Sequence, residues 1–370
     1  MPLSLFLAGF LAASAPDHGE HRLWQLYEKR DFFSLQRDLP AASSADSARL
    51  QVLRAQTASA FGRYEESNRI LRAVLQTNLS DAPLERAARE RLMLNERALF
   101  HYRAALAAIL PAMHSASLRN RAKLLVVLQD VPPEVLRVSA GSVILHLDHF
   151  GAVQVSSNRT LLNLGVDTGA NLSVLSRSAA RRAGLHIRPA GYRIRLANGK
   201  TVYADVAAAR LRFGPTVELS SVVFLVLPDS ALRVAGRQVL DGLIGLPQLS
   251  QLGDIQFKTD GTVVLNAAHS GSIEEPIALI EGDPVVQVMF RTRRILCRID
   301  TGSNRTVLYG KFPKQMFTAL GIAERTIQLR HPVSLLRANQ PYVNCSLGRD
   351  ALRQLEPYTL NLHTMKLGVN

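Results

Sequence analysis

The tripeptide Asp-Thr-Gly occurs twice in this chain of 370 residues, and the two copies constrain its fold more than any other feature. They occupy residues 167–169 and 300–302. Each copy closes an apolar run, and each is followed by a small residue and a second apolar stretch. This pattern predicts a strand that ends in an acidic turn and then returns as a strand. Two such turns can place two carboxylates face to face.

Two neighbouring carboxylates, here those of Asp167 and Asp300, can act together on a water molecule. They share one proton, because two negative charges in one place are costly. The ionised member can take a proton from water, and the protonated member can stabilise the oxyanion that forms when this water attacks a carbonyl group. The sequence does not say which aspartate holds the proton. The alternative interpretation is that each aspartate only closes a tight turn, and the repeated context counts against it.

Further similarities follow each acidic turn. An apolar-apolar-Gly element occurs at residues 243–245 and, with a weaker first position, at 346–348. Beyond these elements the chain repeats without gaps: Leu249, Gln251 and Leu252 match Leu352, Gln354 and Leu355, and Ile255 and Phe257 match Tyr358 and Leu360. These features resemble the pepsin and retropepsin clan of aspartic peptidases, and residues 167–185 resemble bacterial retropepsin-like domains. The resemblance covers the C-terminal two-thirds of the chain and implies two β-lobes, each donating one acidic loop.

The resemblance also assigns tasks to the residues around the catalytic pair Asp167 and Asp300. The threonines of the family cross-link the two loops beneath the carboxylates, and the glycines let backbone amides approach them. A serine after the second copy can hydrogen-bond the outer oxygen of Asp300. The supporting residues are therefore Thr168, Gly169, Thr301, Gly302 and Ser303.

Three residues depart from the expected pattern. Ser346 weakens the second apolar-apolar-Gly element, and Arg298 and Arg305 lie close to Asp300 in the sequence. Strand alternation places Arg298 on the same face as Asp300. An arginine that points into the site would stabilise both carboxylates as anions and abolish the shared proton.

The first lobe has a longer segment between its acidic turn and its bracing glycine than the second lobe has. Within it, Asn198 and Gly199 form a strong hairpin signal between two strand-like runs. In two-lobed relatives the first lobe supplies a flap over the cleft, so this hairpin is the candidate flap, with Tyr203 able to reach the substrate. The alternative is an ordinary edge hairpin.

Residues from about 18 to 135 have the apolar spacing of helices. Three segments around Phe33, Tyr64 and Tyr102 share an aromatic position and resemble degenerate tetratricopeptide helix pairs, and an irregular helical bundle is the alternative. We therefore expect a multidomain α and β chain: a helical, repeat-like domain followed by a mainly β, two-lobed aspartic peptidase fold. The expected division is a signal peptide at 1–15, the helical domain at 16–135, lobe 1 at 136–270 and lobe 2 at 274–370, with residues 271–276 linking the lobes.

The formal charge of +14 does not by itself indicate nucleic-acid binding, because the basic residues are scattered and form no stripe with aromatic residues. The two cysteines, Cys297 and Cys345, lack the spacing of metal ligands. We expect neither a metal nor an organic cofactor. Two buried free thiols are the expected state of these cysteines, although their strands should be close enough for a disulfide.

Residues 1–15 have the apolar stretch and small-residue end of a secretory signal, but no basic residue precedes the apolar run. This predicts export to a bacterial periplasm or envelope, with a cytoplasmic location as the alternative. No other segment has the ~18 apolar residues that span a bilayer, so an uncleaved signal would be the only anchor.

Together these features predict an aspartic endopeptidase that hydrolyses an extended polypeptide, with the helical domain binding a protein partner. Two alternatives stay open. In the first alternative, the chain is a catalytically silent scaffold that binds peptides or proteins. In the second, it is a self-dimerising retropepsin whose second lobe is only structural. The second Asp-Thr-Gly, with Asp300, counts against both.

Overall fold

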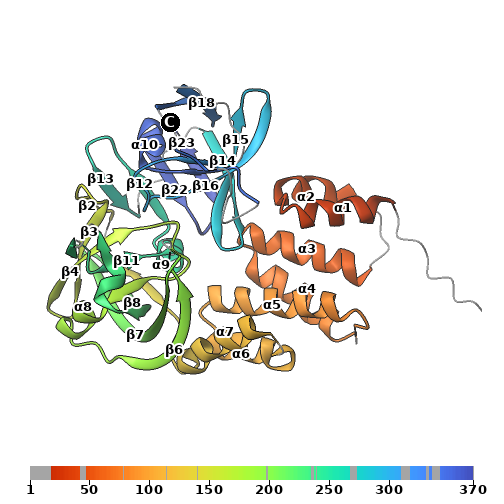
Figure 1. Ribbon diagram of the computed structural model, residues 1–370, viewed down its shortest axis with the longest axis horizontal. Helices are drawn as coiled ribbons and strands as arrows, with labels where there is room; N and C mark the ends of the chain where they lie inside the picture. Colours follow the sequence, from red (N-terminus) through yellow and green to blue (C-terminus); the bar gives the residue numbers. More distant parts are fainter. Residues whose placement is uncertain are drawn as a thin grey trace, which may run out of the picture.

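The structure is a computed structural model (Figure 1). It describes residues 18–41, 47–77, 79–113, 115–139, 141–196, 199–234, 237–238, 240–266, 273–309, 317–330, 333–335 and 342–369. Residues 1–15, the expected signal peptide, lie outside these ranges. No helix within them is long and apolar enough to cross a membrane.

The N-terminal region is helical, as predicted. Its helices are α1 (His18–Glu28), α2 (Phe32–Asp38), α3 (Ala48–Ala60), α4 (Tyr64–Leu75), α5 (Ala82–Ala98), α6 (Tyr102–Ile109) and α7 (Ala116–Leu128). Side chains cap three of the longer ones: Ser47, Asp81 and Ser115 each accept a hydrogen bond from the backbone N–H three residues on. The first six helices follow one another as three pairs, and the second helix of each pair begins with an aromatic residue.

Lobe 1 is built on an eight-stranded sheet in the order β1-β8-β5-β11-β4-β3-β7-β6. Its strands are β1 (Val135–Val138), β3 (Ala152–Ser157), β4 (Thr160–Val166), β5 (Val174–Ser176), β6 (Arg188–Arg195), β7 (Thr201–Phe213), β8 (Val217–Leu227) and β11 (Gly242–Ile244). The short strands β9 (Arg233–Val234) and β10 (Arg237–Gln238) pair separately, and helix α8 (Arg177–Arg182) follows β5.

A second sheet has strands from both lobes. It begins with β2 (Val143–His146), β13 (Thr262–Leu265), β12 (Asp254–Phe257), β22 (Tyr358–Asn361), β23 (Lys366–Val369) and β14 (Ile273–Ile280). Strands β12 and β22 pair antiparallel, with Ile255 opposite Leu360 and Phe257 opposite Tyr358. These are the residues that match in the sequence repeat. The two strands that carry the copies of the repeat are therefore related by an approximate two-fold axis within this sheet. Of residues 271–276, expected to link the lobes, 271 and 272 lie outside the described residues, and 273–276 form the first half of β14.

Lobe 2 continues this sheet beyond β14. Its strands are β15 (Asp283–Phe290), β16 (Arg293–Ile299), β21 (Cys345–Leu347), β17 (Val307–Tyr309) and β20 (Val333–Leu335), with a hairpin of β18 (Phe317–Ile322) and β19 (Arg325–Arg330) attached to β15. Helices α9 (Leu246–Gln251) and α10 (Arg349–Leu352) begin directly after the glycines that end the two apolar-apolar-Gly elements.

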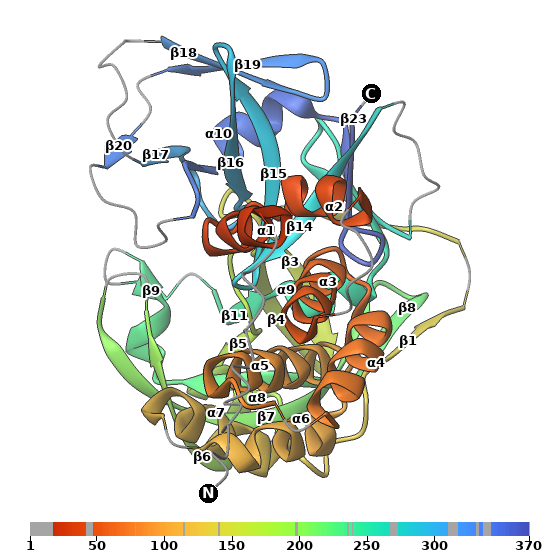
Figure 2. The same cartoon turned by 90° about the vertical axis from the view of Figure 1, so that its right-hand side faces the viewer.

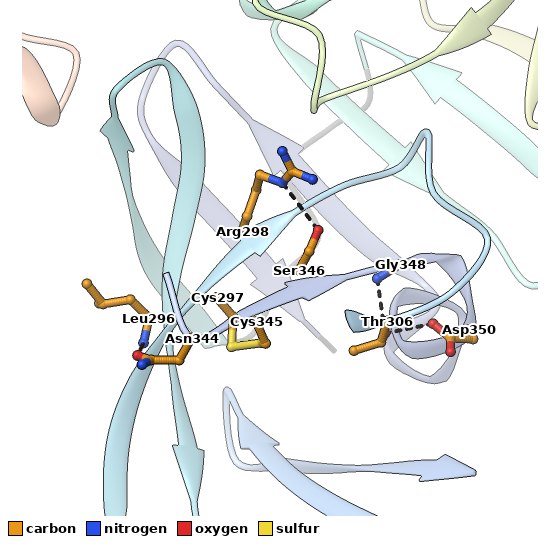
Figure 3. Close-up of a disulfide and its surroundings, with 9 residues drawn as sticks. All are labelled: Leu296, Cys297, Arg298, Thr306, Asn344, Cys345, Ser346, Gly348 and Asp350. Atoms are coloured by element: carbon orange, nitrogen blue, oxygen red, sulfur yellow. Dashed lines mark hydrogen bonds between the residues drawn. A yellow bond between two sulfur atoms is a disulfide. The ribbon is translucent and has the colours of Figure 1, made fainter. Parts of the chain in front are cut away.

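The expectation of two free thiols was wrong. Cys297 and Cys345 form a disulfide with an S–S distance of 1.99 Å (Figure 3). The reason is the parallel pairing of β16 with β21, which puts the two residues directly opposite each other with their Cα atoms 4.6 Å apart. This separation lies within the range that a disulfide bridges.

The helices form one layer that covers both lobes (Figure 2). Helices α1 to α3 share a hydrophobic cluster with Ala278 and Ile280 of β14 and Val285 of β15. At the other end of the layer, α7 packs on β6, and Asn120 exchanges two hydrogen bonds with the backbone of Arg193 at 2.8 and 2.9 Å. The helical region therefore buries apolar surface against the β-lobes and is part of their support.

We expect this shared core to make the helical layer and lobe 2 unfold together. Leu35 of α2 is fully buried in the cluster that contains Ala278. Replacement of Leu35 by Ala should lower the free energy of unfolding by about 2–5 kcal/mol, since it leaves a cavity. Chemical denaturation followed by circular dichroism measures this loss. Val126→Ala, at a side chain that is 51% exposed, is the control and should change little. Two separate transitions, with only one affected by Leu35→Ala, would contradict a shared core.

Candidate active site

The two acidic loops are braced in the same way in the two lobes. Strand β4 runs into Asp167 and pairs in parallel with β11, while β16 runs into Asp300 and pairs in parallel with β21. The backbone N–H of each aspartate donates to the carbonyl of the middle residue of its apolar-apolar-Gly element, Ile244 or Leu347, at 3.0 Å. The bracing thus comes from the backbone, and the polar Ser346 does not weaken it.

The glycines of these elements approach the loops closely. The N–H of Gly245 donates to the hydroxyl of Ser173 at 2.8 Å, and that of Gly348 donates to the hydroxyl of Thr306 at 3.0 Å. A Cβ atom at Gly245 would lie 2.5 Å from the carbonyl oxygen of Ala170, which is too close for any side chain. The repeated glycines therefore let each brace meet its acidic loop.

Thr168 and Thr301 cross-link the two loops at the contact between the lobes. The N–H of each threonine donates to the hydroxyl of the other at 3.0 Å. Each hydroxyl in turn donates across the contact, that of Thr168 to the carbonyl of Ile299 at 2.7 Å and that of Thr301 to the carbonyl of Val166 at 2.8 Å. Both threonines are buried. This network fixes one acidic loop relative to the other.

The two carboxylates lie next to each other above this network. A Cβ atom placed on Gly169 would be 3.0 Å from one oxygen of Asp300 and 3.1 Å from one oxygen of Asp167. On Gly302 it would be 2.4 Å from the carboxyl carbon of Asp167. Each glycine thus faces the carboxylate of the opposite loop, and only glycine leaves room for that carboxylate. The structure brings together the two aspartates that the sequence singled out.

Backbone amides hold the inner oxygens of the pair. The N–H of Gly169 donates to Asp167 Oδ1 at 2.8 Å, and the N–H of Ser303 donates to Asp300 Oδ1 at 3.1 Å. The expected hydrogen bond from the Ser303 hydroxyl to Asp300 is not formed. That hydroxyl donates instead to the carbonyl of Arg305 at 2.9 Å, because the loop turns back on itself there.

The two arginines that flank Asp300 behave differently. Arg305 is exposed. Arg298 faces the site, as strand alternation predicted, and its Nη2 lies 2.6 Å from Asp300 Oδ2. Burial opposes the charge of Arg298, but the carboxylates of Asp300 and Asp283 together raise its pKa. One member of the carboxylate pair is therefore paired with a permanent cation.

The charge state of Asp167 differs from that of an ordinary surface aspartate. Burial, and then the negative charge of Asp300, raises the pKa of Asp167 to about 6. Arg298 lowers it, by a smaller amount. Burial and the charge of Asp300 thus outweigh Arg298, and Asp167 holds its proton to higher pH than an ordinary aspartate does.

The candidate flap is a hairpin of β6 and β7, with Arg195 opposite Thr201. Asn198 lies outside the described residues, and Gly199 has a φ of +81°, which suits a tight turn. Tyr203 is 65% exposed. The hairpin packs on α7 of the helical layer, a contact that nothing in the sequence signalled. Its action as a flap stays a prediction.

Sequence reasoning missed two residues beside the site. Asp283, at the start of β15, is 1% exposed, and one of its oxygens lies 3.6 Å from Arg298 Nη1. The hydroxyl of Tyr342 donates to its other oxygen at 2.8 Å. Neither residue belongs to a motif, so only the fold could bring them to Arg298. Within the described residues, no three His, Cys, Asp or Glu side chains are grouped to hold a metal ion.

Comparison with known proteins gives one family match. Residues 153–247, which include Asp167, its brace and the candidate flap, match the family model "Aspartyl protease". The match thus supports an aspartic peptidase fold for lobe 1, and it does not extend to lobe 2. No curated protein matches the chain.

Solved structures of low identity also match. The soybean basic 7S globulin has 13% identity and a TM-score of 0.41, and the match covers 64% of this chain and 95% of that one. An aspartic proteinase from Irpex lacteus has 12% identity and a TM-score of 0.42, covering 62% and 97%. A retropepsin-like aspartic protease from Rickettsia conorii has 16% identity and a TM-score of 0.25, covering 36% and 94%.

The raised pKa of Asp167 predicts how stability depends on pH. The folded protein holds this proton more tightly than the unfolded chain, where the pKa of an aspartate is about 3.9. The stabilisation is complete below that value and is lost as the pH rises through about 6. Between these limits the wild type should lose up to about 3 kcal/mol of unfolding free energy relative to Asp167→Asn, which cannot titrate. Urea denaturation at graded pH measures the difference. Parallel curves for the two proteins would refute the raised pKa.

Proposed function

We propose that this chain is an aspartic endopeptidase with both catalytic lobes on one polypeptide. The observation that carries the proposal is the placement of the Asp167 and Asp300 carboxylates against each other, over two loops that Thr168 and Thr301 cross-link. Water-activating carboxylate pairs need this closeness, so that one proton is shared. The family match over residues 153–247 supports the same activity.

The reaction follows from one ionised and one protonated carboxylate. The ionised member takes a proton from a water molecule, and the water oxygen bonds to the carbonyl carbon of the substrate. The protonated member gives its proton to the carbonyl oxygen, which forms a tetrahedral diol. When the C–N bond breaks, the amine takes the proton gained from water, and the diol returns the other proton to the pair. No covalent intermediate with the protein forms.

The substrate is proposed to be a polypeptide in extended form, because it has to pair its backbone with strand edges between two β-lobes.

The helical layer is proposed to consist of tetratricopeptide-like pairs that also bind a protein partner. The succession of three helix pairs supports the first part. Affinity capture by the wild type, compared with capture by a variant carrying charge reversals on exposed residues of α4 and α6, tests the second.

Export to a bacterial periplasm or envelope is the proposed location. The disulfide between Cys297 and Cys345 supports it, because disulfides persist in oxidising compartments and are rare in the cytosol. Two measurements on protein isolated from cells test it: the mass of its N-terminal peptide, and the fraction of the two cysteines that resists thiol labelling. A retained Met1 together with two reactive thiols would refute export.

The second candidate function is a catalytically silent scaffold. The contact between Arg298 and Asp300 favours it, because a cation beside the pair opposes proton sharing. The raised pKa of Asp167 favours the enzyme. The two functions predict different outcomes for replacement of the aspartates.

Replacement of either aspartate should remove nearly all hydrolysis. We expect Asp167→Asn and Asp300→Asn each to reduce the initial rate by roughly 100- to 10,000-fold, because general acid–base catalysis is lost. The rate is measured on a denatured protein mixture by mass-spectrometric mapping of new termini. Asp130→Asn, at a carboxylate whose side chain is 69% exposed, is the control and should hydrolyse normally. Full activity of Asp300→Asn would exclude the two-lobe mechanism, and no cleavage by the wild type at any pH would favour the scaffold.

The rate should pass through a maximum in acidic solution. Its alkaline limb should fall near pH 6, where Asp167 loses its proton. Its acidic limb reflects protonation of the ionised member of the pair. Initial rates measured from strongly acidic to mildly alkaline pH test this expectation. A rate that still climbs above neutrality would indicate a different base.

A further inference from the structure

The two lobes differ at the position two residues before each catalytic aspartate. In lobe 1 this position is Gly165, which lies opposite Leu243 of β11. A Cβ atom there would be 2.8 Å from a methyl carbon of Leu243, so an apolar side chain fills the place. In lobe 2 the position is Arg298, opposite Ser346 of β21. The two-fold arrangement of the backbone thus carries a charged group on one side only.

Arg298 is held from three directions. Its Nη2 donates to Asp300 Oδ2 at 2.6 Å and its Nε to the hydroxyl of Ser346 at 3.2 Å, a bond drawn in Figure 3. Its Nη1 lies 3.6 Å from an oxygen of Asp283. The side chain is 19% exposed. A guanidinium in this setting has little freedom to leave Asp300.

Two tyrosines support the position of Arg298. Tyr342 donates to Asp283, and Tyr342 and Tyr309 both pack against the hydrophobic cluster that contains helices α1 to α3. The helical layer therefore lies behind the residues that hold Arg298. This contact links the N-terminal helices to the catalytic pair, although they are far apart in the sequence.

Hydrogen-bond donors are divided unequally between the two carboxylates. Asp300 accepts from Arg298, from the hydroxyl of Ser346 at 3.2 Å and from the N–H of Ser303. Within the described part of the chain, the Asp167 carboxylate interacts with backbone N–H donors, those of Gly169 at 2.8 Å and of Ala170, and no side chain is recorded as donating to it. Donors, and a cation above all, favour the ionised form of a carboxyl group.

Among the residues that the structure describes, the charged and titratable groups around Asp300 come from four elements. They are Arg298 on β16, Asp283 on β15, Tyr309 on β17 and Asp167 on the opposite loop. Only Arg298 is a cation, and it contacts Asp300 directly.

We propose that Arg298 is a positioning residue that keeps Asp300 as the anion of the pair and leaves the shared proton on Asp167. The proposal rests on the proposed peptidase function and assigns its two roles. Asp300 takes the proton from water, and Asp167 protonates the carbonyl oxygen of the substrate. Asp300 then passes its proton to the departing amine, and the diol returns a proton to Asp167, so the charge state is restored after each turnover.

Replacement of Arg298 should move the whole pH profile. In Arg298→Met the cation beside the ionised carboxylate is lost, so the acidic limb of kcat/KM should shift upward by roughly 1–3 pH units. The alkaline limb should also rise, because Arg298 lowers the pKa of Asp167. Arg298→Lys keeps a charge and should hold both limbs nearer to the wild type.

Arg177→Met is the matched control. Arg177 lies in lobe 1, and its Nη2 contacts Asp205 at 2.6 Å, the same distance as in the Arg298–Asp300 pair. Its removal should leave both limbs in place. A merely structural role of Arg298 would reduce the rate at every pH without moving the limbs, and that outcome would overturn the proposal.

A titration that needs no activity separates this proposal from the proposed function. The side-chain carboxyls of the full-length protein are labelled with 13C at Asp, and the signals are assigned with Asp167→Asn and Asp300→Asn. In mildly acidic solution we expect the signals to show Asp300 ionised and Asp167 protonated, and Arg298→Met to make the two signals more alike. This assignment in a wild type that cleaves nothing would refute the peptidase and retain the role of Arg298. The reverse assignment in an active wild type would refute the role of Arg298 and retain the peptidase. If Arg298→Met does not fold, the charge states of the two carboxyls in the wild type and in Arg298→Lys decide.

Discussion

The hydrogen bonds between Thr168 and Thr301 are the contact on which the rest of the candidate site depends. Each threonine uses its amide and its hydroxyl across the contact between the lobes, so the two loops lock each other in a single relative position. Carboxylates carried on separate lobes would otherwise move apart, because like charges repel and water solvates each of them better alone. A buried donor or acceptor left without a partner is costly. The network therefore keeps the two loops together despite the repulsion between their carboxylates. The proposed reaction needs these carboxylates close to each other.

Other elements hold the lobes in the relation that this contact needs. Strands β12 and β22 join them through one sheet, and β14 continues that sheet into lobe 2. The helical layer adds apolar contacts to the β14–β15 side of lobe 2 and hydrogen bonds to the β6–β7 hairpin of lobe 1. The N-terminal region thus supports both lobes, which a partner-binding domain on a free linker would not do.

The backbone is nearly two-fold symmetric around the carboxylates, and the side chains break that symmetry. Gly165 and Leu243 on one side face Arg298 and Ser346 on the other. A symmetric pair of carboxylates has no reason to prefer a proton on either member. One cation on one side supplies such a preference, and the fixed geometry of a guanidinium suits it to hold a carboxylate oxygen.

The sequence by itself determined the features that are repeated or periodic. The two Asp-Thr-Gly turns, their apolar-apolar-Gly braces and the helical N-terminal region follow from local patterns, because strand and helix periods and glycine requirements are written along the chain. The contacts of single residues could not be read in this way. The hydroxyl of Ser303 donates to the carbonyl of Arg305 within its own loop, which no sequence pattern specifies. The sequence placed the strands of Cys297 and Cys345 near each other, but only the register of β16 on β21 put the two residues directly opposite. Asp283 lies beside Arg298 because β15 pairs with β16, and it belongs to no motif, so only the tertiary structure decided this contact.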